Sequence, residues 1–180
     1  MEKPVRLATK SGRAAPALAT PTDLPTEAVA AIAEQLNGLI ADAFALYIKT
    51  KNFHWHISGP HFRDYHLMLD EHGDQIFATI DPLAERVRKL GAPTIRTVSE
   101  IAKMTRVRES SETFVPPLLM LQQLGADNKA MAANMRKAHG VCDEHDDVAT
   151  ASLLEVYIDE TERRTWFLFE SSRAADGTGH

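Results

Sequence analysis

The chain has one cysteine, Cys142, in 180 residues, which excludes a disulfide framework and a cysteine-based zinc site. It also lacks an apolar run near the ~20 residues that cross a bilayer, and its start has no continuous apolar core of a signal peptide. Both absences predict a cytoplasmic protein. Basic residues are fewer than acidic ones, 20 against 25. The net charge of −5 excludes a folded body that grips nucleic acid through a basic face.

Composition divides the chain into three parts. Residues 1–25 are rich in Ala, Pro and Thr without a sustained period, which predicts a flexible arm. The arm is mildly basic, whereas the body is acidic. Residues 26–173 are long enough for one well-buried domain, and residues 174–180 form a short C-terminal tail.

The periodicity of the body predicts four long helices. Apolar residues recur on one helical face from Thr26 to about His56, where a Ser-Gly-Pro turn follows. The other long helices are expected at about 60–90, 113–139 and 147–172. A short helix, TVSEIAKM, lies in the link 91–111. Two helical hairpins joined by one long crossover define an all-α, ferritin-like four-helix bundle. The expected core of the third helix consists of Phe114, Leu118, Leu121, Leu124, Met131 and Met135. The last helix carries Leu153, Leu154, Tyr157, Ile158, Trp166, Phe167 and Phe169.

The stretch FHWHISGPHFRDYH, residues 53–66, holds four histidines around a Gly-Pro turn. His54 and His66 are equally distant from Pro60, so a helical hairpin places them opposite each other. Imidazoles combined with carboxylates suit iron, manganese or zinc. The carboxylates that share a helical face with His66 are Asp70, Asp81 and Glu85.

These ligands cannot all meet within one chain. His66 and Glu85 are about 28 Å apart along a helix that rises 1.5 Å per residue. The pairs His66/Glu85 and Asp70/Asp81 are, however, centred on the same point of the helix, near residue 75. Two antiparallel copies related by a two-fold axis there would complete two sites per dimer. The predicted metal ligands are His54, His66 and Asp70 of one subunit with Asp81 and Glu85 of the other.

The alternative is that these side chains form an ordinary solvated helix face. Against it, Asp81 and Glu85 at i,i+4 repel each other unless a cation lies between them. The remaining histidines are expected at the surface, with His56 and His61 as weaker ligand candidates because they flank the turn. The others are His72, His139, His145 and His180.

Residues 51–91 resemble the signature of the Dps family, the ferritin-like DNA-binding proteins from starved cells. The matching positions are His54-Trp55, Gly59-Pro60, His66, Asp70, Asp81, Ala84-Glu85-Arg86 and Leu90-Gly91. The resemblance implies a twelve-subunit shell that oxidises Fe(II) at a di-iron ferroxidase centre in the dimer interface, often with hydrogen peroxide, and stores ferric mineral. It implies the same five ligands, and it matches Trp55 to a tryptophan beside the centre. The alternative for Trp55 is an aromatic that packs in the interface.

The resemblance also implies a path for iron and a contact with DNA. Acidic residues before the last helix would line pores at three-fold axes, although Asp146 or Asp147 could instead cap that helix. The acidic residues concerned are Asp143, Glu144, Asp146 and Asp147. Twelve copies of the basic arm would bind DNA phosphates without sequence preference, or the arm would only aid solubility. Its basic residues are Lys3, Arg6, Lys10 and Arg13.

Three functions therefore remain open. The first is a ferroxidase and iron store that protects DNA from oxidative damage. The second is a non-specific DNA-binding nucleoid protein whose metal site is secondary. The third is a ferritin-like protein that binds zinc or manganese, because the ligand types do not distinguish these metals from iron.

Overall fold

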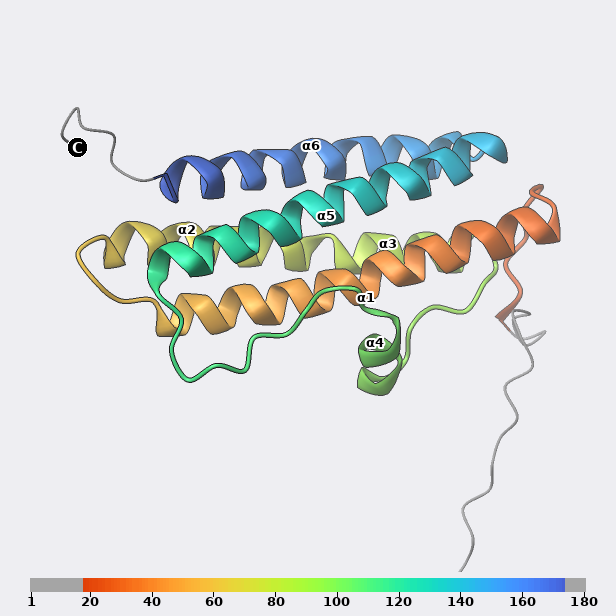
Figure 1. Cartoon of the computed structure of the whole chain (residues 1–180). Coiled ribbons are helices and arrows are strands. Elements are labelled where there is room, and N and C mark those ends of the chain that lie inside the picture. Colours follow the sequence, from red (N-terminus) through yellow and green to blue (C-terminus); the bar gives the residue numbers. More distant parts are fainter. Residues whose placement is uncertain (1–17, 174–180) are drawn as a thin grey trace, which may run out of the picture.

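The computed structural model describes residues 18–173, and the regular structure in that range is helical. The helices are α1 (Thr26–His56), α2 (Phe62–Ala78), α3 (Ile80–Lys89), α4 (Val98–Met104), α5 (Pro117–Glu144) and α6 (Val148–Ser171). α2 and α3 continue each other as one rod, which forms a four-helix bundle with α1, α5 and α6 (Figure 1). The predicted ferritin-like fold, with a short helix in the crossover, is thus confirmed. The predicted arm up to residue 17 and the tail 174–180 lie outside the described residues.

The core of the bundle is built around α1. Ile32, Leu36, Leu39 and Leu46 are fully buried, at the helical spacing seen in the sequence. Each such burial stabilises the fold by about 1.5–3 kcal/mol. By length and composition alone α1 could cross a membrane, but half of its apolar window is buried inside the bundle. α1 is therefore the core helix of the bundle.

The predicted helix 60–90 is interrupted at Thr79, which separates α2 from α3. Pro82 has no N–H to donate to the carbonyl of Ala78, four residues earlier. The Thr79 hydroxyl donates instead to the Ile76 carbonyl at 2.8 Å. These two local effects break the hydrogen-bond ladder just before the segment that carries Asp81.

α5 and α6 form the second hairpin and lie side by side (Figure 1). α5 begins four residues later than predicted because Pro116 and Pro117 favour extended backbone before them. It ends at Glu144 rather than near residue 139, and the added turn includes the buried Cys142. The polar break between α5 and α6 is therefore only residues 145–147.

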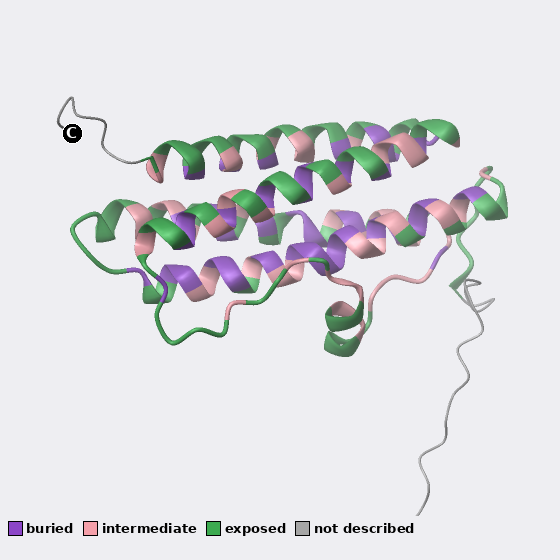
Figure 2. Cartoon of the chain, viewed as in Figure 1, coloured by how far each residue is buried: buried purple, intermediate pink, exposed green. Residues whose placement is uncertain are grey.

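Several large apolar residues of the last two helical segments are exposed in the single chain. Phe114 and Leu118 are 63% and 45% exposed, so their prediction as core residues is wrong, and Phe114 precedes the start of α5. Trp166 and Phe169 on α6 are 61% and 60% exposed, because the inward face of this part of α6 is occupied by Arg164 and Leu168. Figure 2 shows that much of the outward surface of α5 and α6 is exposed.

The crossover is held to α1 by hydrogen bonds of Asn37 and Asn52 and by a buried carboxylate, Asp42, which is 1% exposed. Its Oδ1 accepts from the backbone N–H of Arg106 at 2.6 Å. Its Oδ2 accepts from Nε of Arg106 at 2.8 Å and forms an ion pair with Nη2 at 2.6 Å. A charged acceptor with both oxygens engaged forms strong hydrogen bonds, so Asp42 determines where the chain runs after α4.

Candidate metal centre

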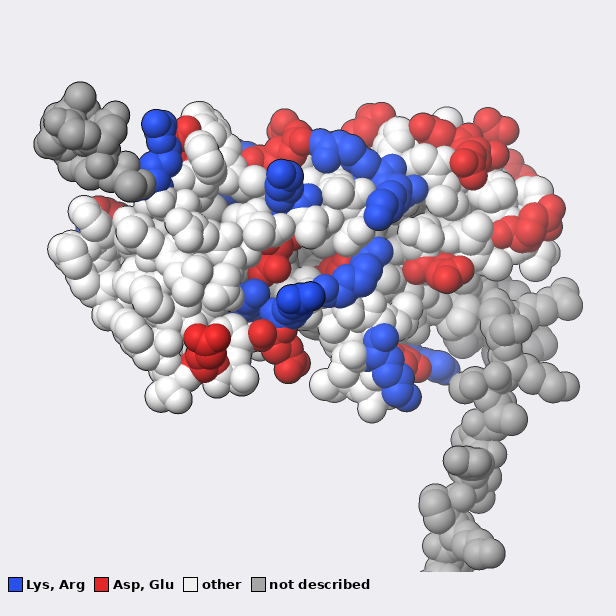
Figure 3. All heavy atoms as spheres, viewed as in Figure 1, with Lys and Arg blue, Asp and Glu red and all other residues white. Residues whose placement is uncertain are grey.

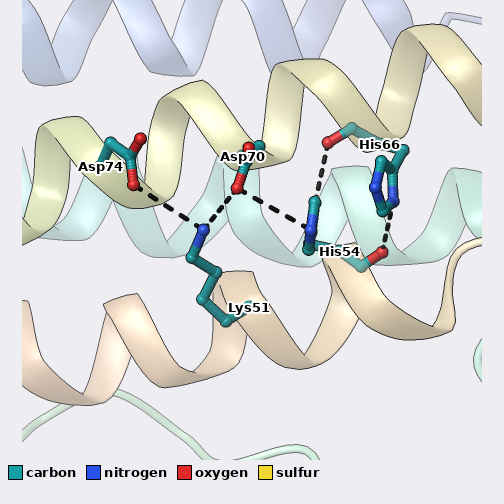
Figure 4. A network of polar contacts seen from close by, with 5 residues as sticks. All are labelled: Lys51, His54, His66, Asp70 and Asp74. Atoms are coloured by element: carbon teal, nitrogen blue, oxygen red, sulfur yellow. Dashed lines mark hydrogen bonds and ion pairs between the residues drawn. The ribbon is translucent and has the colours of Figure 1, made fainter.

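The turn after α1 brings His54 and His66 into direct contact, as the equal spacing from Pro60 predicts. Their rings stack with centroids 3.8 Å apart and an interplanar angle of 23°. Nδ1 of His54 lies 2.8 Å from the backbone oxygen of His66, and Nδ1 of His66 lies 2.9 Å from that of His54. Figure 4 shows this reciprocal pair across the α1–α2 hairpin.

These contacts fix the tautomer of both rings. A carbonyl oxygen can only accept, so each Nδ1 must carry a proton and donate it. In the neutral ring Nε2 then has a free lone pair. Histidines that bind metals typically donate their other N–H to a carbonyl or carboxylate, which orients the ring and raises its basicity. His54 and His66 therefore have the Nδ1–H to carbonyl hydrogen bonds that are typical of metal-binding histidines.

Asp70 lies next to this pair and carries the negative charge. Its Oδ1 is 3.8 Å from Nε2 of His54. The same oxygen accepts from Lys51 Nζ at 2.5 Å, and Asp74 lies 3.7 Å from that ammonium (Figure 4). The hydrogen bond from Lys51 lowers the pKa of Asp70. The nearby imidazoles of His54 and His66 lower the pKa of Asp70 as well. Asp70 is consequently ionised and ready to bind a cation.

Asp81 and Glu85 lie on α3, away from the histidines of the same chain. Glu85 forms an exposed ion pair with Lys89 at 3.3 Å. Asp81 borders a hollow of about 270 Å³ that is lined mainly by apolar residues, among them Phe44 and Ile80. In residues 18–173 no group of three or more His, Cys, Asp or Glu side chains could hold a metal ion. Within one subunit, His54, His66 and Asp70 therefore lie near one another without forming a complete metal site. Asp81 and Glu85 of the same subunit do not join them.

Lys51 is the site residue that the sequence analysis missed. Its position one helical turn before His54 was the available signal, since i and i+3 lie on one face. If Asp70 is a metal ligand as predicted, a metal ion that binds its Oδ1 would displace the Lys51 ammonium. Lys51 would then be an internal cation that competes with the metal.

We expect Lys51→Gln to bind divalent metal more tightly, by about 2- to 5-fold, because partly exposed ion pairs contribute up to about 1 kcal/mol. Calorimetric titration of the anaerobic protein with Fe(II) measures the change. Arg96→Gln, which removes the exposed Arg96–Glu100 pair on the crossover, is the matched control and should bind as wild type. Unchanged or weaker binding in Lys51→Gln would show that Lys51 does not compete with the metal.

The other aromatic and histidine candidates have different surroundings. Trp55 is 65% exposed and points away from the core of its own chain. Nδ1 of exposed His56 donates to the Asn52 carbonyl at 2.7 Å, whereas His61 packs on Tyr65. His72 is buried, at 2% exposed, so its prediction as a surface residue is wrong. Its side of α2 packs against α6, where it meets Phe167 edge to face.

The acidic turn between α5 and α6 serves more than one purpose. Asp147 is buried and caps α6, accepting from the Thr150 N–H at 3.1 Å, and it pairs with Arg86 at 2.6 Å. The capping alternative therefore applies to Asp147. The acidic residues of this turn that remain exposed are Asp143, Glu144 and Asp146. Figure 3 shows acidic side chains gathered at this end of the molecule.

Burial and the nearby carboxylates raise the pKa of the adjacent Cys142 thiol to about 12, so it stays protonated.

Comparison with known proteins agrees with the fold. Residues 33–171 match a model of the ferritin-like domain family. A DNA protection during starvation protein from Brevibacillus brevis is 31% identical over 139 residues, which cover 76% of this chain and 91% of the relative. The crystal structure of Dps from Thermosynechococcus elongatus superimposes with a TM-score of 0.79 and 29% identity, over 83% of this chain and 94% of that one.

A third similar structure is described by the metal chemistry of its superfamily. Dps from Vibrio cholerae O1, described as a member of a superfamily of ferritin-like diiron-carboxylate proteins, aligns with a TM-score of 0.80 and 27% identity. That alignment covers 86% of this chain and 98% of the other. The chain belongs to the Dps family of the ferritin-like superfamily.

Proposed function

We propose that this protein is a ferroxidase and iron store that oxidises Fe(II) with hydrogen peroxide at a site shared by two subunits. The reciprocal hydrogen bonds of His54 and His66 carry the proposal, because in the neutral rings they leave the Nε2 lone pairs free to bind a metal, with Asp70 3.8 Å from Nε2 of His54. Asp81 and Glu85 of the second subunit would complete the ligand set. Trp55, exposed next to His54, would accept stray oxidising equivalents.

The ligand types suit this reaction. Carboxylate oxygens are hard ligands that favour Fe(III) over Fe(II), while two imidazoles hold the entering Fe(II). Two Fe(II) ions and two protons reduce one hydrogen peroxide to two waters, and each iron loses one electron. A site for two irons therefore consumes peroxide without releasing a one-electron product. The weaker iron position would be the one that displaces Lys51 from Asp70.

The surface of the chain supports association with further copies. Large apolar side chains are exposed near the end of α1, the start of α2 and the start of α5, namely Trp55, Phe62, Phe114 and Leu118. Apolar patches of this kind mark interaction surfaces. Membership of the Dps family implies a homo-oligomer. We extend this to a dodecameric shell with the site at its two-fold axes, a ferric mineral core, and entry past the exposed carboxylates of the α5–α6 turn.

Protection of DNA would follow from the iron chemistry. The Brevibacillus brevis relative carries DNA protection in its name. Removing Fe(II) and peroxide together prevents their reaction near DNA in the cytoplasm. Direct contact with the nucleoid through the basic arm depends on Lys3, Arg6, Lys10 and Arg13, which lie outside the described residues. No described residue favours that alternative.

The direct test uses the purified protein loaded anaerobically with Fe(II). Hydrogen peroxide is injected, and ferric absorbance is followed beside a protein-free sample and a sample given dissolved oxygen alone. We expect fast oxidation by peroxide, with the product held in solution by the protein. Oxidation no faster than in buffer would contradict the proposal, whereas equal rates with oxygen would change only the oxidant.

A further inference from the structure

Arg164 on α6 places a positive charge inside the bundle without a carboxylate partner. Its side chain is 1% exposed. Nε donates to Asn128 Oδ1 at 3.0 Å and Nη2 donates to Thr161 Oγ1 at 2.7 Å, and both acceptors are neutral. Within residues 18–173, Nη1 has no hydrogen-bond partner. Burial lowers the pKa of Arg164 to about 10, and the carboxylate of Glu160, one turn earlier on α6, offsets only part of this effect and forms no ion pair with it. Leaving a buried charge without a close counter-ion is costly, so a negative group beside Nη1 would stabilise this position.

Two more buried polar atoms lack partners in the same part of the molecule. Thr50 Oγ1 on α1 and His72 Nδ1 on α2 are without a hydrogen bond among the described residues. Thr50 is 1% exposed and His72 is 2% exposed. A hydroxyl, an imidazole N–H and a guanidinium N–H can all donate. All three groups can therefore act as donors to a bound acceptor, provided that Nδ1 of His72 carries the ring proton.

Contacts between neighbouring residues place these groups at one level of the bundle. Thr50, His72 and Arg164 each have a sequence neighbour that forms an ion pair with another helix. These pairs are Lys49–Asp127 between α1 and α5, Lys51–Asp70 between α1 and α2, and Arg163–Glu71 between α6 and α2. The fourth side is closed by Arg164 and Asn128. We call Thr50, His72, Asn128 and Arg164, one from each rod of the bundle, the central polar layer.

We propose that the central polar layer binds one small monovalent anion, with chloride as the candidate, through Nη1 of Arg164 and the Thr50 and His72 donors. A metal cation does not fit, because the layer has a guanidinium and no carboxylate. A water molecule would satisfy the donors but leave the charge uncompensated. The layer therefore disfavours cations between the helices, where ferritin-like di-iron proteins bind metal, and leaves the α1–α2 face for iron.

The test compares thermal unfolding of the intact protein in sodium chloride and in sodium gluconate at equal ionic strength. We expect the wild type to unfold about 2–4 °C higher in chloride, since a ligand that binds only the folded state raises its stability. Arg164→Met should lose this difference, and Thr50→Val, which keeps the buried charge and the fold, should reduce it. Arg163→Met, the exposed neighbour on the same helix, should keep it.

Crystals grown in sodium bromide give an independent readout, because bromide scatters anomalously. A bromide peak within hydrogen-bond distance of Arg164 Nη1 is the expected result. An ordered water without an anomalous signal would overturn the proposal. So would equal unfolding temperatures in the two salts for the wild type, or the same chloride effect in Arg164→Met and in Thr50→Val as in the wild type.

Discussion

Replacing both Asp81 and Glu85 with alanine is expected to slow peroxide-driven oxidation of Fe(II) by about 100-fold or more, since loss of even a supporting residue at a metal site costs 10- to 100-fold. The two carboxylates supply the hard oxygen ligands that His54 and His66 lack. Neither side chain packs in the core of its own subunit, so the variant should fold and assemble normally. Stopped-flow ferric absorbance gives the rate, and size-exclusion chromatography checks the assembly.

The control for this variant must remove two negative charges elsewhere. Asp64→Ala with Asp159→Ala does so at exposed positions on α2 and α6. We expect it to keep most of the wild-type rate, because general attraction of cations is screened by salt. If both double variants oxidised iron at the same rate, Asp81 and Glu85 would not be ligands of the reacting iron.

Asp42→Ala should cause the largest loss of stability. Removing Asp42 leaves the backbone N–H of Arg106 without its acceptor, which typically costs about 1–3 kcal/mol, whereas the guanidinium of Arg106 is 44% exposed and regains water. The link between α1 and the segment after α4 would weaken, while hydrogen bonds of Asn37 and Asn52 still join α1 to the crossover. Urea unfolding at one fixed protein concentration measures the change, because association contributes to the stability of an oligomer.

A graded substitution distinguishes this ion pair from simple packing. Asp42→Asn keeps the size of the side chain and one acceptor oxygen, so its loss of stability should lie between wild type and Asp42→Ala. Glu100→Gln, which weakens the exposed pair with Arg96, should change the free energy of unfolding by less than about 1 kcal/mol. A loss below 1 kcal/mol in Asp42→Ala would show that the crossover is held by its other contacts, which include the hydrogen bonds of Asn37 and Asn52.

The sequence predicted the helices and the contact between His54 and His66 well, for local reasons. Helical periodicity reports which face is buried, and a Gly-Pro turn sets where a hairpin folds back. Two residues equally distant from that turn must then meet, and the stacked imidazoles do. The role of these residues in iron oxidation stays a prediction, because two of the five proposed ligands, Asp81 and Glu85, come from another subunit.

Other features depend on packing that periodicity does not show. The burial of His72 and Arg164 depends on the interface between α2 and α6, and polar residue types gave no signal for it. The exposure of Trp166 and Phe169 was equally hidden, since an apolar residue type does not tell whether the side chain faces the core of the bundle or its surface. Lys51 was missed because a lysine beside a metal site offers no ligand.

The most direct test of a shared site mixes two inactive variants. One is His54→Ala/His66→Ala and the other is Asp81→Ala/Glu85→Ala, and they are unfolded together and reassembled at equal amounts. A mixed dimer has one site with both defects and one intact site. Random pairing should therefore restore about a quarter of the wild-type sites, measured as peroxide-driven Fe(II) oxidation. Activity no greater than that of either variant alone would contradict a site built from two subunits.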